Sequence, residues 1–209
     1  MKRFLPTLAL MAVFLCSNAI AQTIDNDAKL LREVESYLNS LTTAKGTFLQ
    51  SASRGGYATG NFFLSRPGKI RFDYNPPNNI MLMADGRDFI YYDKDLVQIT
   101  YLSLDASIAG VLIKDKIDFS DKQFNVEDIS ENGGIIRLSI SQSEDPLAGK
   151  LIMTFKRSPM QILKWQVIDA QNIATTVILE EMQYGIELDK SLFKFDNPRA
   201  SSDFQRRRR

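Results

Sequence analysis

The apolar residues of the chain follow two different periods, which divide the sequence into predicted helices and strands. From Asn26 to Leu41 they recur every three or four residues, the spacing of one face of an α-helix. Asp25 and Asp27 stand at the start of this segment, where the helix dipole favours negative charge. The pattern therefore predicts an amphipathic helix.

Beyond Leu41 the apolar residues alternate with polar ones, which is typical of half-buried β-strands. Turn-forming pairs rich in Gly, Pro and Asp separate the alternating segments. The predicted strands are Thr47 to Ser51, Asn61 to Arg66, Lys69 to Tyr74, Ile80 to Ala84, Asp88 to Tyr92, Gln123 to Ile129, Ile135 to Ser141, Lys150 to Phe155, Ile162 to Ile168, Thr175 to Gln183 and Phe193 to Phe195. Between Leu102 and Ile117 helical spacing returns and predicts a second, shorter helix.

The order of these elements predicts the architecture. Most neighbouring strands are joined by turns and not by helices, which favours an antiparallel meander over a parallel α/β sheet. A sheet of that many strands curls, and its apolar concave face must be covered. We therefore expect a mainly β fold, with a large curved sheet and the two amphipathic helices over its concave face.

The first residues have the order of a secretory signal peptide. Lys2 and Arg3 precede an apolar run, and the small-residue triplet Ala19-Ile20-Ala21 ends the segment. The apolar run is shorter than the ~20 residues needed to cross a bilayer. We expect residues 1–21 to be a signal peptide cleaved after Ala21, which places the mature protein outside the cytoplasm.

The remaining chain has the length of one domain. We assign residues 22–200 to that domain and residues 201–209 to a basic, disordered tail. The formal charge of +1 falls to −1 without Lys2 and Arg3, and to −5 when Arg206 to Arg209 are also left out. A mildly acidic body argues against a nucleic-acid partner, which selects a basic folded face. The basic tail has an alternative interpretation as a contact for anionic lipid.

Composition excludes several kinds of catalytic site. The sequence has no histidine, and its one cysteine, Cys16, lies inside the predicted signal peptide. Ser-His-Asp and Cys-His nucleophile systems are therefore excluded, as are zinc sites with nitrogen and sulfur ligands. Leu15 precedes Cys16 where lipoprotein processing selects a small side chain, which speaks against a membrane-anchored receptor.

A carboxylate-based hydrolase is the remaining enzyme hypothesis, because acidic residues are dense in one part of the chain. Turns and strand surfaces account for these positions better than a catalytic cleft does. The residues concerned are Asp73, Asp85, Asp88, Asp93 and Asp95. We expect no enzymatic activity, no cofactor and no metal site.

Several segments resemble the periplasmic lipoprotein carriers of the Lol pathway, the LolA family. The strongest has Arg66-Pro67-Gly68 at its centre, and the resemblance weakens from about Ile117 to Glu187. The matching segments are Leu38 to Leu41, Gly46 to Gln50, Gly60 to Pro77, Ile80 to Gly86, Tyr91 to Asp93 and Phe193 to Phe195 with Pro198. Many members have a Trp near the position of Phe72, whereas this chain has its one tryptophan, Trp165, on a later predicted strand.

The resemblance implies an incomplete, open antiparallel β-barrel of about ten or eleven strands, with two or three helices over its concave apolar face. It implies a periplasmic carrier that binds the acyl chains of lipoproteins released by an inner-membrane ABC transporter. The carrier delivers them to an outer-membrane lipoprotein receptor, catalyses no reaction and is expected to be a monomer. The alternative is a lipid-binding or sensor domain on the same fold that does not shuttle lipoproteins.

Strand alternation and the resemblance together select the candidate site. The resemblance gives Arg66 the role of a gate that holds a lid by hydrogen bonds to the second helix, around Val111 to Ile113. The acyl-chain cavity is expected to be lined by Leu38, Phe48, Phe62, Leu64, Ile70, Phe72, Tyr74, Leu82, Val111, Leu112 and Ile113. The alternatives are an ordinary filled core and a solvated arginine before a turn.

Overall fold

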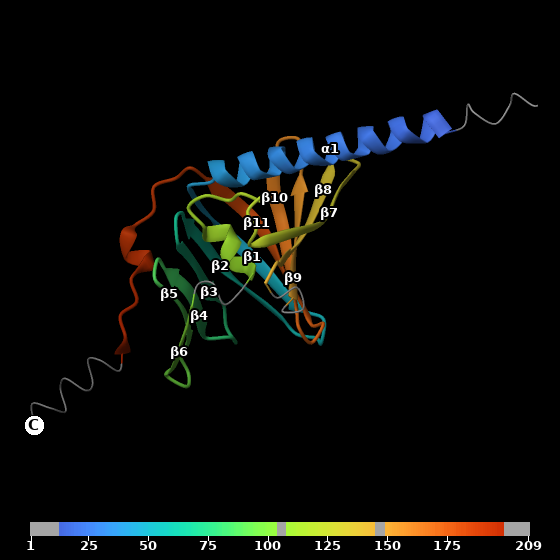
Figure 1. The fold of residues 1–209 in the computed structure, drawn as a ribbon. Coiled ribbons are helices and arrows are strands. Elements are labelled where there is room, and N and C mark those ends of the chain that lie inside the picture. Colours follow the sequence, from blue (N-terminus) through green and yellow to red (C-terminus); the bar gives the residue numbers. More distant parts are fainter. Residues whose placement is uncertain (1–12, 104–107, 145–148, 199–209) are drawn as a thin grey trace, which may run out of the picture.

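The computed structural model describes residues 13–103, 108–144 and 149–198. The predicted tail over 201–209 lies outside these residues, as does the first part of the predicted signal peptide. The described residues form one long α-helix, two short 3₁₀-helices and a single curved sheet (Figure 1). The fold is mainly β, as the alternating pattern predicts.

The long helix α1 spans Val13–Ser40. It therefore begins 13 residues before the predicted start at Asn26 and continues through the predicted segment without a break. Leu30, Val34 and Leu38 recur at intervals of four and are at most 2 % exposed. They form the face that packs on the sheet, and full burial of such side chains contributes about 1.5–3 kcal/mol each. The helix ends at Ser40, just before the β-branched pair Thr42-Thr43 that leads into the first strand.

The sheet has 11 strands among the described residues, and every neighbouring pair is antiparallel. The strands are β1 Thr43–Ala52, β2 Tyr57–Ser65, β3 Lys69–Tyr74, β4 Ile80–Asp85, β5 Asp88–Asp93, β6 Gln98–Ser103, β7 Phe124–Asn132, β8 Ile135–Gln142, β9 Gly149–Lys156, β10 Gln161–Asp169 and β11 Ala174–Tyr184. Their spatial order is β6-β5-β4-β3-β2-β1-β11-β10-β9-β8-β7. Chain-distant β1 and β11 pair at the centre, while β6 and β7 form the two edges, so the barrel is open.

Three elements differ from the predicted ones. Strand β6 was not predicted, and its Leu102 pairs with Phe89 in the sheet, so the predicted helix cannot begin there. A short 3₁₀-helix, η2 (Ile108–Ile113), replaces that helix. Gly110 disfavours an α-helix at this point. Residues 104–107 lie outside the described part of the chain.

The predicted strand from Phe193 to Phe195 is also wrong. A 3₁₀-helix, η4 (Lys190–Phe193), occupies its beginning, and the Asp189 carboxylate caps it by accepting a hydrogen bond from Ser191 N at 2.8 Å. The cap satisfies a helix-end N–H that a strand would have paired across the sheet.

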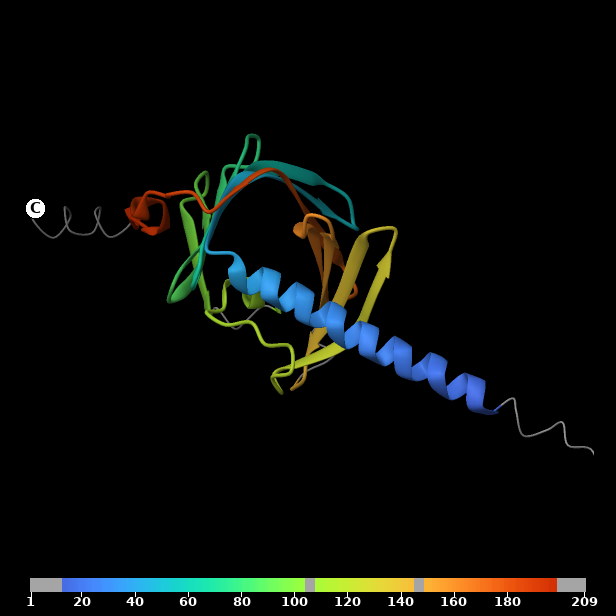
Figure 2. The same ribbon diagram turned by 90° about the horizontal axis from the view of Figure 1, so that it is seen from above.

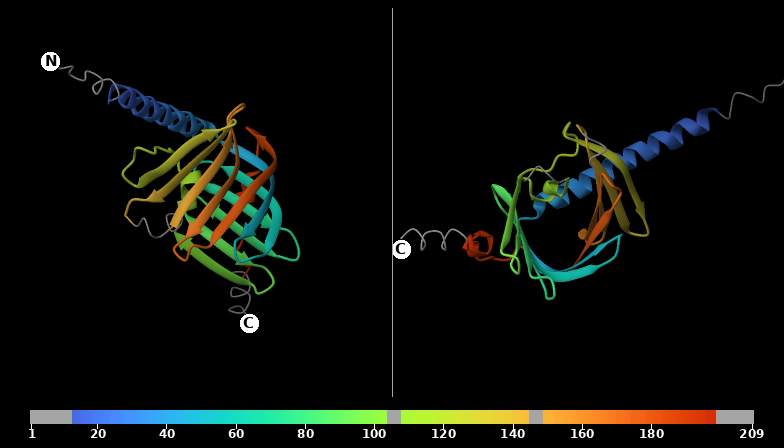
Figure 3. Two further views of the ribbon diagram at one scale, coloured as in Figure 1. Left: turned by 90° about the vertical axis from the view of Figure 1, so that its right-hand side faces the viewer. Right: turned by 90° about the horizontal axis from the view of Figure 1, so that it is seen from below.

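The curvature of the sheet places its apolar side chains on a concave face. Seen from above, α1 crosses the open end of the barrel, and η2 lies beside the helix (Figure 2). Ile136, Leu138 and Ile140 alternate along β8 and are fully buried beneath this cover. Views from the side and from below show strands curving around the space under the helix (Figure 3). The concave face therefore holds the main core.

A smaller apolar cluster lies on the outer face of β4 and β5. Met81, Met83 and Ile90 are at most 4 % exposed there. Phe195 covers the cluster, with its ring centroid 5.6 Å from that of Tyr92. Arg71 Nη1 donates to the Leu192 carbonyl at 2.7 Å, so the C-terminal segment packs on the outside of the sheet and away from the cavity.

Candidate functional site

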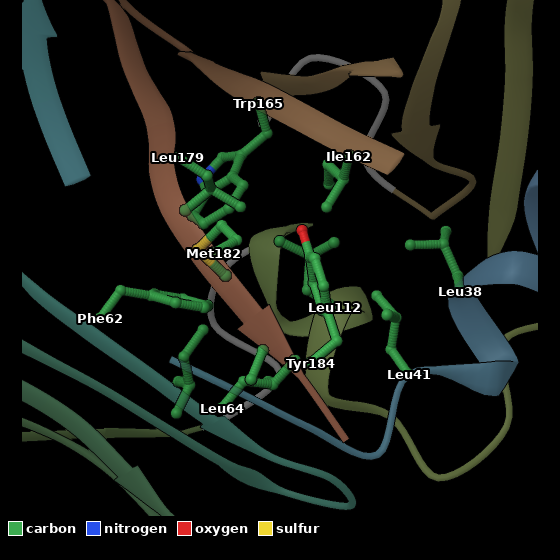
Figure 4. A pocket seen from close by; sticks show the side chains of 12 residues that line it. Leu38, Leu41, Phe62, Leu64, Leu112, Ile162, Trp165, Leu179, Met182 and Tyr184 are labelled. Carbon is green, nitrogen blue, oxygen red and sulfur yellow. The ribbon is translucent and has the colours of Figure 1, made fainter. Parts of the chain in front are cut away.

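An apolar cavity lies under α1, inside the concave face of the sheet. Five residues of the predicted lining surround it, namely Leu38, Phe62, Leu64, Ile70 and Leu112. Seven further residues complete the lining, namely Leu41, Ala44, Ile162, Trp165, Leu179, Met182 and Tyr184. Figure 4 shows these side chains converging from the helix and from both halves of the sheet. The lining is almost entirely apolar.

The other predicted lining residues do not border this cavity. Phe48, Phe72, Val111 and Ile113 are buried in the same core, at 6 % exposure or less. Tyr74 and Leu82 are partly buried and pack against that core. These six side chains therefore support the lining from behind or to the side.

The cavity is small, at about 20 Å³. This volume corresponds to about one water molecule. The lining side chains therefore fill most of the space that they enclose, and the structure shows a closed form of the site. Any larger apolar ligand requires the cover or the lining to move.

Aromatic side chains continue from the lining into the core behind it. Phe72 packs against Phe48 and Phe62 with ring centroids 5.2 Å apart in each case, and against Trp165 at 6.2 Å. Trp165 comes from β10, so the tertiary structure brings this one tryptophan next to Phe72.

A polar pair adjoins these aromatic side chains, because the Tyr74 ring packs against Phe48 with the centroids 5.1 Å apart. The Tyr74 hydroxyl donates to Gln50 Oε1 at 2.7 Å. Burial raises the pKa of Tyr74 to about 12, and the bond to Gln50 partly offsets this effect. A buried hydroxyl with a partner avoids the cost of an unsatisfied polar group.

Arg66 lies between the end of α1 and the segment that follows η2. Its Nε and Nη2 donate to the Lys114 carbonyl at 3.0 and 2.6 Å, and Nη2 also donates to the Asp115 carbonyl at 3.3 Å. Its Nη1 donates to the Leu38 carbonyl of α1. The acceptors thus lie just beyond the segment from Val111 to Ile113 that the sequence singles out, and the helix end is a second partner.

The chain around Arg66 is held by backbone bonds as well. Arg66 N donates to the Thr42 carbonyl and Gly68 N donates to the Ile113 carbonyl, both at 2.7 Å. Burial lowers the pKa of the Arg66 guanidinium from its ordinary value, while the nearby Asp115 carboxylate acts in the opposite direction. The guanidinium still carries its charge at neutral pH, so its hydrogen bonds are charge-assisted.

Side chains of α1 bind the same segment directly. Asn39 Nδ2 donates to the Ile117 carbonyl at 2.7 Å, and Ile117 N donates back to Asn39 Oδ1 at 2.8 Å. Phe119 N donates to Glu35 Oε2 at 3.1 Å. Helix α1 and residues 114–119 are therefore joined into one cover over the cavity, which we call the lid.

The opposite flank of α1 contacts β9 and β10. The N–H of Ile162 donates to the Tyr37 hydroxyl at 2.9 Å, and burial raises the pKa of this tyrosine. Arg157 forms ion pairs with Glu33 of α1 at 3.0 Å and with Glu131 of β7. These partly exposed ion pairs tie the helix to the sheet at some distance from the cavity.

Two β-bulges explain why the alternation of apolar residues in the sequence does not predict the lining residues of β10 and β11. The pairing of β10 shifts between Ile162 and Lys164, so Ile162 and Trp165 both face inward although they are three residues apart. In β11, Glu181 has a φ of 52° beside a second shift, and Leu179 and Met182 both face inward. A bulge inserts one residue and reverses the alternation beyond it.

The acidic residues that raised a hydrolase hypothesis serve turns and surface pairs. Asp73 pairs with Arg71 at 2.8 Å. Asp85 Oδ1 accepts bonds from the N–H groups of Arg87 and Asp88 at 2.9 and 3.0 Å. Asp93 binds the N–H groups of the next turn in the same way. The described residues contain no group of three or more side chains that could hold a metal ion.

Comparison with known proteins identifies the family of this chain. The family model for the outer membrane lipoprotein carrier protein LolA matches residues 39–196. The chain belongs to the LolA family. The matched residues include the end of α1, the whole sheet, Arg66 and η4. In the described part of this LolA-family chain, no helix has the length and apolar character needed to cross a membrane.

Relatives match over most of their length. An outer-membrane lipoprotein carrier protein of Ralstonia nicotianae is 27% identical over 205 residues, which cover 92% of this chain and 94% of the relative. An uncharacterized protein of Rickettsia prowazekii (strain Madrid E) is 26% identical over 199 residues, covering 95% and 91%. The similarity therefore extends over nearly the whole LolA-family chain.

A solved structure has the same fold at low sequence identity. An uncharacterized conserved protein of Thermus thermophilus superposes with a TM-score of 0.50 at 9% identity, covering 82% of this chain and 94% of that one. At this identity the likeness concerns the fold alone.

Proposed function

We propose that this protein is a periplasmic carrier of acylated lipoproteins, exported with cleavage after Ala21. In this role it accepts cargo from an inner-membrane ABC transporter and passes it to an outer-membrane receptor, without catalysing a reaction. The observation that carries the proposal is the closed apolar cavity under a lid that Arg66 holds through backbone carbonyls. Membership of the LolA family supports it.

The physical chemistry of the cargo explains why such a site is useful. Each methylene taken out of water contributes about 0.8 kcal/mol, so a free acyl chain keeps a lipoprotein on its membrane or drives it into aggregates. A cavity lined by Phe62, Leu64 and Leu112 offers an alternative apolar environment. The chains can then cross an aqueous compartment.

Release of the cargo requires that the empty protein be stable enough to compete with the loaded protein. The closed lid stabilises the empty protein. In the closed form Arg66, Asn39 and Glu35 all have their hydrogen-bond partners, and the lining side chains contact one another. Opening for cargo breaks some of these interactions, which lowers the net affinity for acyl chains. A moderate affinity allows a tighter-binding receptor to take over the cargo.

A vesicle experiment tests this function. The purified protein is mixed with vesicles that contain a triacylated lipopeptide, and flotation then separates vesicles from free protein. The proposal expects lipopeptide to appear with the protein in the vesicle-free fraction, while the same peptide without acyl chains does not bind. Trp165 lines the cavity, so its emission should change on binding.

Two results would decide against a lipoprotein carrier. If the protein extracts phospholipid and leaves the lipopeptide in the vesicles, the lipid-binding or sensor alternative is correct. If it extracts neither, the cavity does not serve acyl chains at all.

A further inference from the structure

An open groove adjoins the closed cavity at the C-terminal end of α1. The groove has a volume of about 600 Å³, compared with about 20 Å³ for the cavity. It lies between the end of α1, the turn that joins β9 to β10 and the last residues of β11. Leu41, Met182 and Tyr184 line both spaces. These three side chains therefore form a partition between the groove and the cavity.

The partition is weakly held. Gln161 Nε2 donates to the Tyr184 hydroxyl at 3.4 Å, near the long limit for a hydrogen bond. Leu41 and Met182 contribute apolar contacts, and an unbranched methionine changes rotamer easily. All three partition residues are partly exposed. Small side-chain rotations are therefore sufficient to join the two spaces.

The flank of α1 that faces residues 114–119 is held by hydrogen bonds that entry on that side would have to break. There Asn39 and Ile117 exchange two hydrogen bonds of 2.7 and 2.8 Å, and the Arg66 guanidinium donates to carbonyls on both sides. The bonds from Arg66 are charge-assisted and stronger than a neutral bond at 3.4 Å. Access through the partition does not require breaking the Tyr37–Ile162 bond or the Arg157–Glu33 ion pair on the same flank. Access between α1 and residues 114–119, in contrast, breaks bonds of Asn39 and Arg66.

The chemistry of the groove changes with depth. Leu41 and Met182 are apolar and stand next to the cavity, whereas Thr42 and Ser40 carry hydroxyls near the exposed rim. Gln161 adds an amide donor on the opposite wall. The Ser40 hydroxyl already donates to the Tyr37 carbonyl at 2.7 Å, so Thr42 and Gln161 are the donors at the rim. This order suits an amphiphile whose chains point inward and whose ester and amide carbonyls remain at the rim beside these donors.

We propose that this groove is the entrance for acyl chains and the seat of the ester- and amide-linked head of the acylated residue. The chains pass the partition of Leu41, Met182 and Tyr184 into the cavity, while the head stays between Thr42 and Gln161. The inference rests on the proposed function and adds where the cargo enters. The bonds that Arg66 and Asn39 form around residues 114–119 open only after the chains have passed the partition, when the cavity expands around them.

Two single-cysteine variants test the entrance, one on each flank of α1. In a chain with Cys16→Ser, Thr42→Cys places a thiol in the groove, and Lys116→Cys places one on the opposite flank. Both native side chains are exposed, and Lys116 has only a surface ion pair to Asp118 at 3.6 Å. Each thiol is modified with a bulky non-fluorescent maleimide or with a small methylthio group, and stopped-flow Trp165 emission then gives the rate of uptake of a dipalmitoyl lipopeptide.

The bulky group at position 42 should slow both uptake and release by at least about tenfold, because it narrows the path to the cavity. The small group at position 42 and either group at position 116 should leave the rates within about twofold. Unchanged rates with the bulky group at position 42 would overturn the entrance, as would slowing by the bulky group at position 116 alone. Failure of the unmodified protein to take up any lipopeptide would instead overturn the proposed function.

Discussion

Arg66 and Lys114 meet through two hydrogen bonds to a single carbonyl oxygen, from Nε at 3.0 Å and from Nη2 at 2.6 Å. The two residues lie on opposite sides of this contact. Arg66 directly follows β2 of the sheet, whereas Lys114 directly follows η2 and belongs to the lid. The same guanidinium reaches the Leu38 carbonyl at the end of α1. One side chain therefore joins the sheet to both pieces of the lid.

Replacement of Arg66 by leucine should impair transfer of cargo while leaving the fold intact. The variant loses charge-assisted bonds of the closed form, each worth about 1.5–3 kcal/mol. Without these bonds the closed, empty form is less stable relative to the loaded form. Release of cargo to acceptor vesicles should therefore slow by about tenfold or more. The measurement is the rate of lipopeptide transfer from loaded protein.

Arg71→Leu is the matched control for this substitution. Arg71 binds Asp73 and the Leu192 carbonyl on the outer face of the sheet, away from the lid. Its loss should leave the transfer rate unchanged. If Arg66→Leu takes up and transfers lipopeptide like the native chain, Arg66 is not a gate.

Asn39→Ala should loosen the lid without filling or enlarging the cavity. The substitution removes both hydrogen bonds to Ile117 and leaves a backbone N–H and carbonyl without their partner. The free energy of unfolding should fall by about 1–3 kcal/mol. Amide exchange at Ile117 should accelerate before the rest of the sheet responds. Ser40→Ala, which removes a bond to the Tyr37 carbonyl in the same helix, should change that exchange little.

Alkaline pH should destabilise the fold partly through Tyr74. Its pKa is raised from 10.0 to about 12 by burial, so between these values the unfolded chain has released a proton that the folded chain retains. Stability is therefore fully present below pH 10.0 and is lost as the pH rises toward about 12. Urea unfolding across this range should show a smaller loss in Tyr74→Phe than in the native chain. An equal loss in both chains would mean that Tyr74 titrates normally in the fold.

Gly46→Ala should destabilise the bulged pairing of β1 and β11. A Cβ at this position would collide with Met182 Sδ and lie 2.6 Å from the Glu180 carbonyl oxygen. The methionine can move but the carbonyl cannot, so we expect a loss of about 1–3 kcal/mol in the free energy of unfolding. Ser51→Ala on the exposed part of β1 provides the comparison and should cost little. A stability equal to that of the native chain would show that the bulge adapts.

The sequence predicts most elements because their signals are local. Ten of the described strands match alternating segments, and Leu30, Val34 and Leu38 predict the buried face of α1. Prediction from the sequence fails where a local pattern competes with contacts between residues that are far apart in the chain. Phe193 and Phe195 alternate like a strand, yet Phe193 is the buried last residue of a 3₁₀-helix that Asp189 caps, and Phe195 covers the outer cluster.

The candidate site was predictable only in part for the same reason. Leu38, Phe62, Leu64, Ile70 and Leu112 line the cavity and were selected from the strand pattern and the family resemblance. The lining residues of β10 and β11 were not selected, because bulges reverse the alternation on which such a selection depends. A bulge forms between two strands, and a single-sequence pattern shows only one of them.

The sequence by itself therefore determined most of the secondary structure, through the apolar periods of 3.6 and 2. Together with the family resemblance, it singled out Arg66 before the turn at Pro67-Gly68. Only the tertiary structure decided which carbonyls Arg66 binds, which strands supply the rest of the lining, and that a groove of about 600 Å³ adjoins a nearly filled cavity. The reason is physical. Periodicity depends on neighbours within a few residues, whereas a cavity depends on side chains far apart in the sequence, such as Leu38 and Trp165, meeting in space.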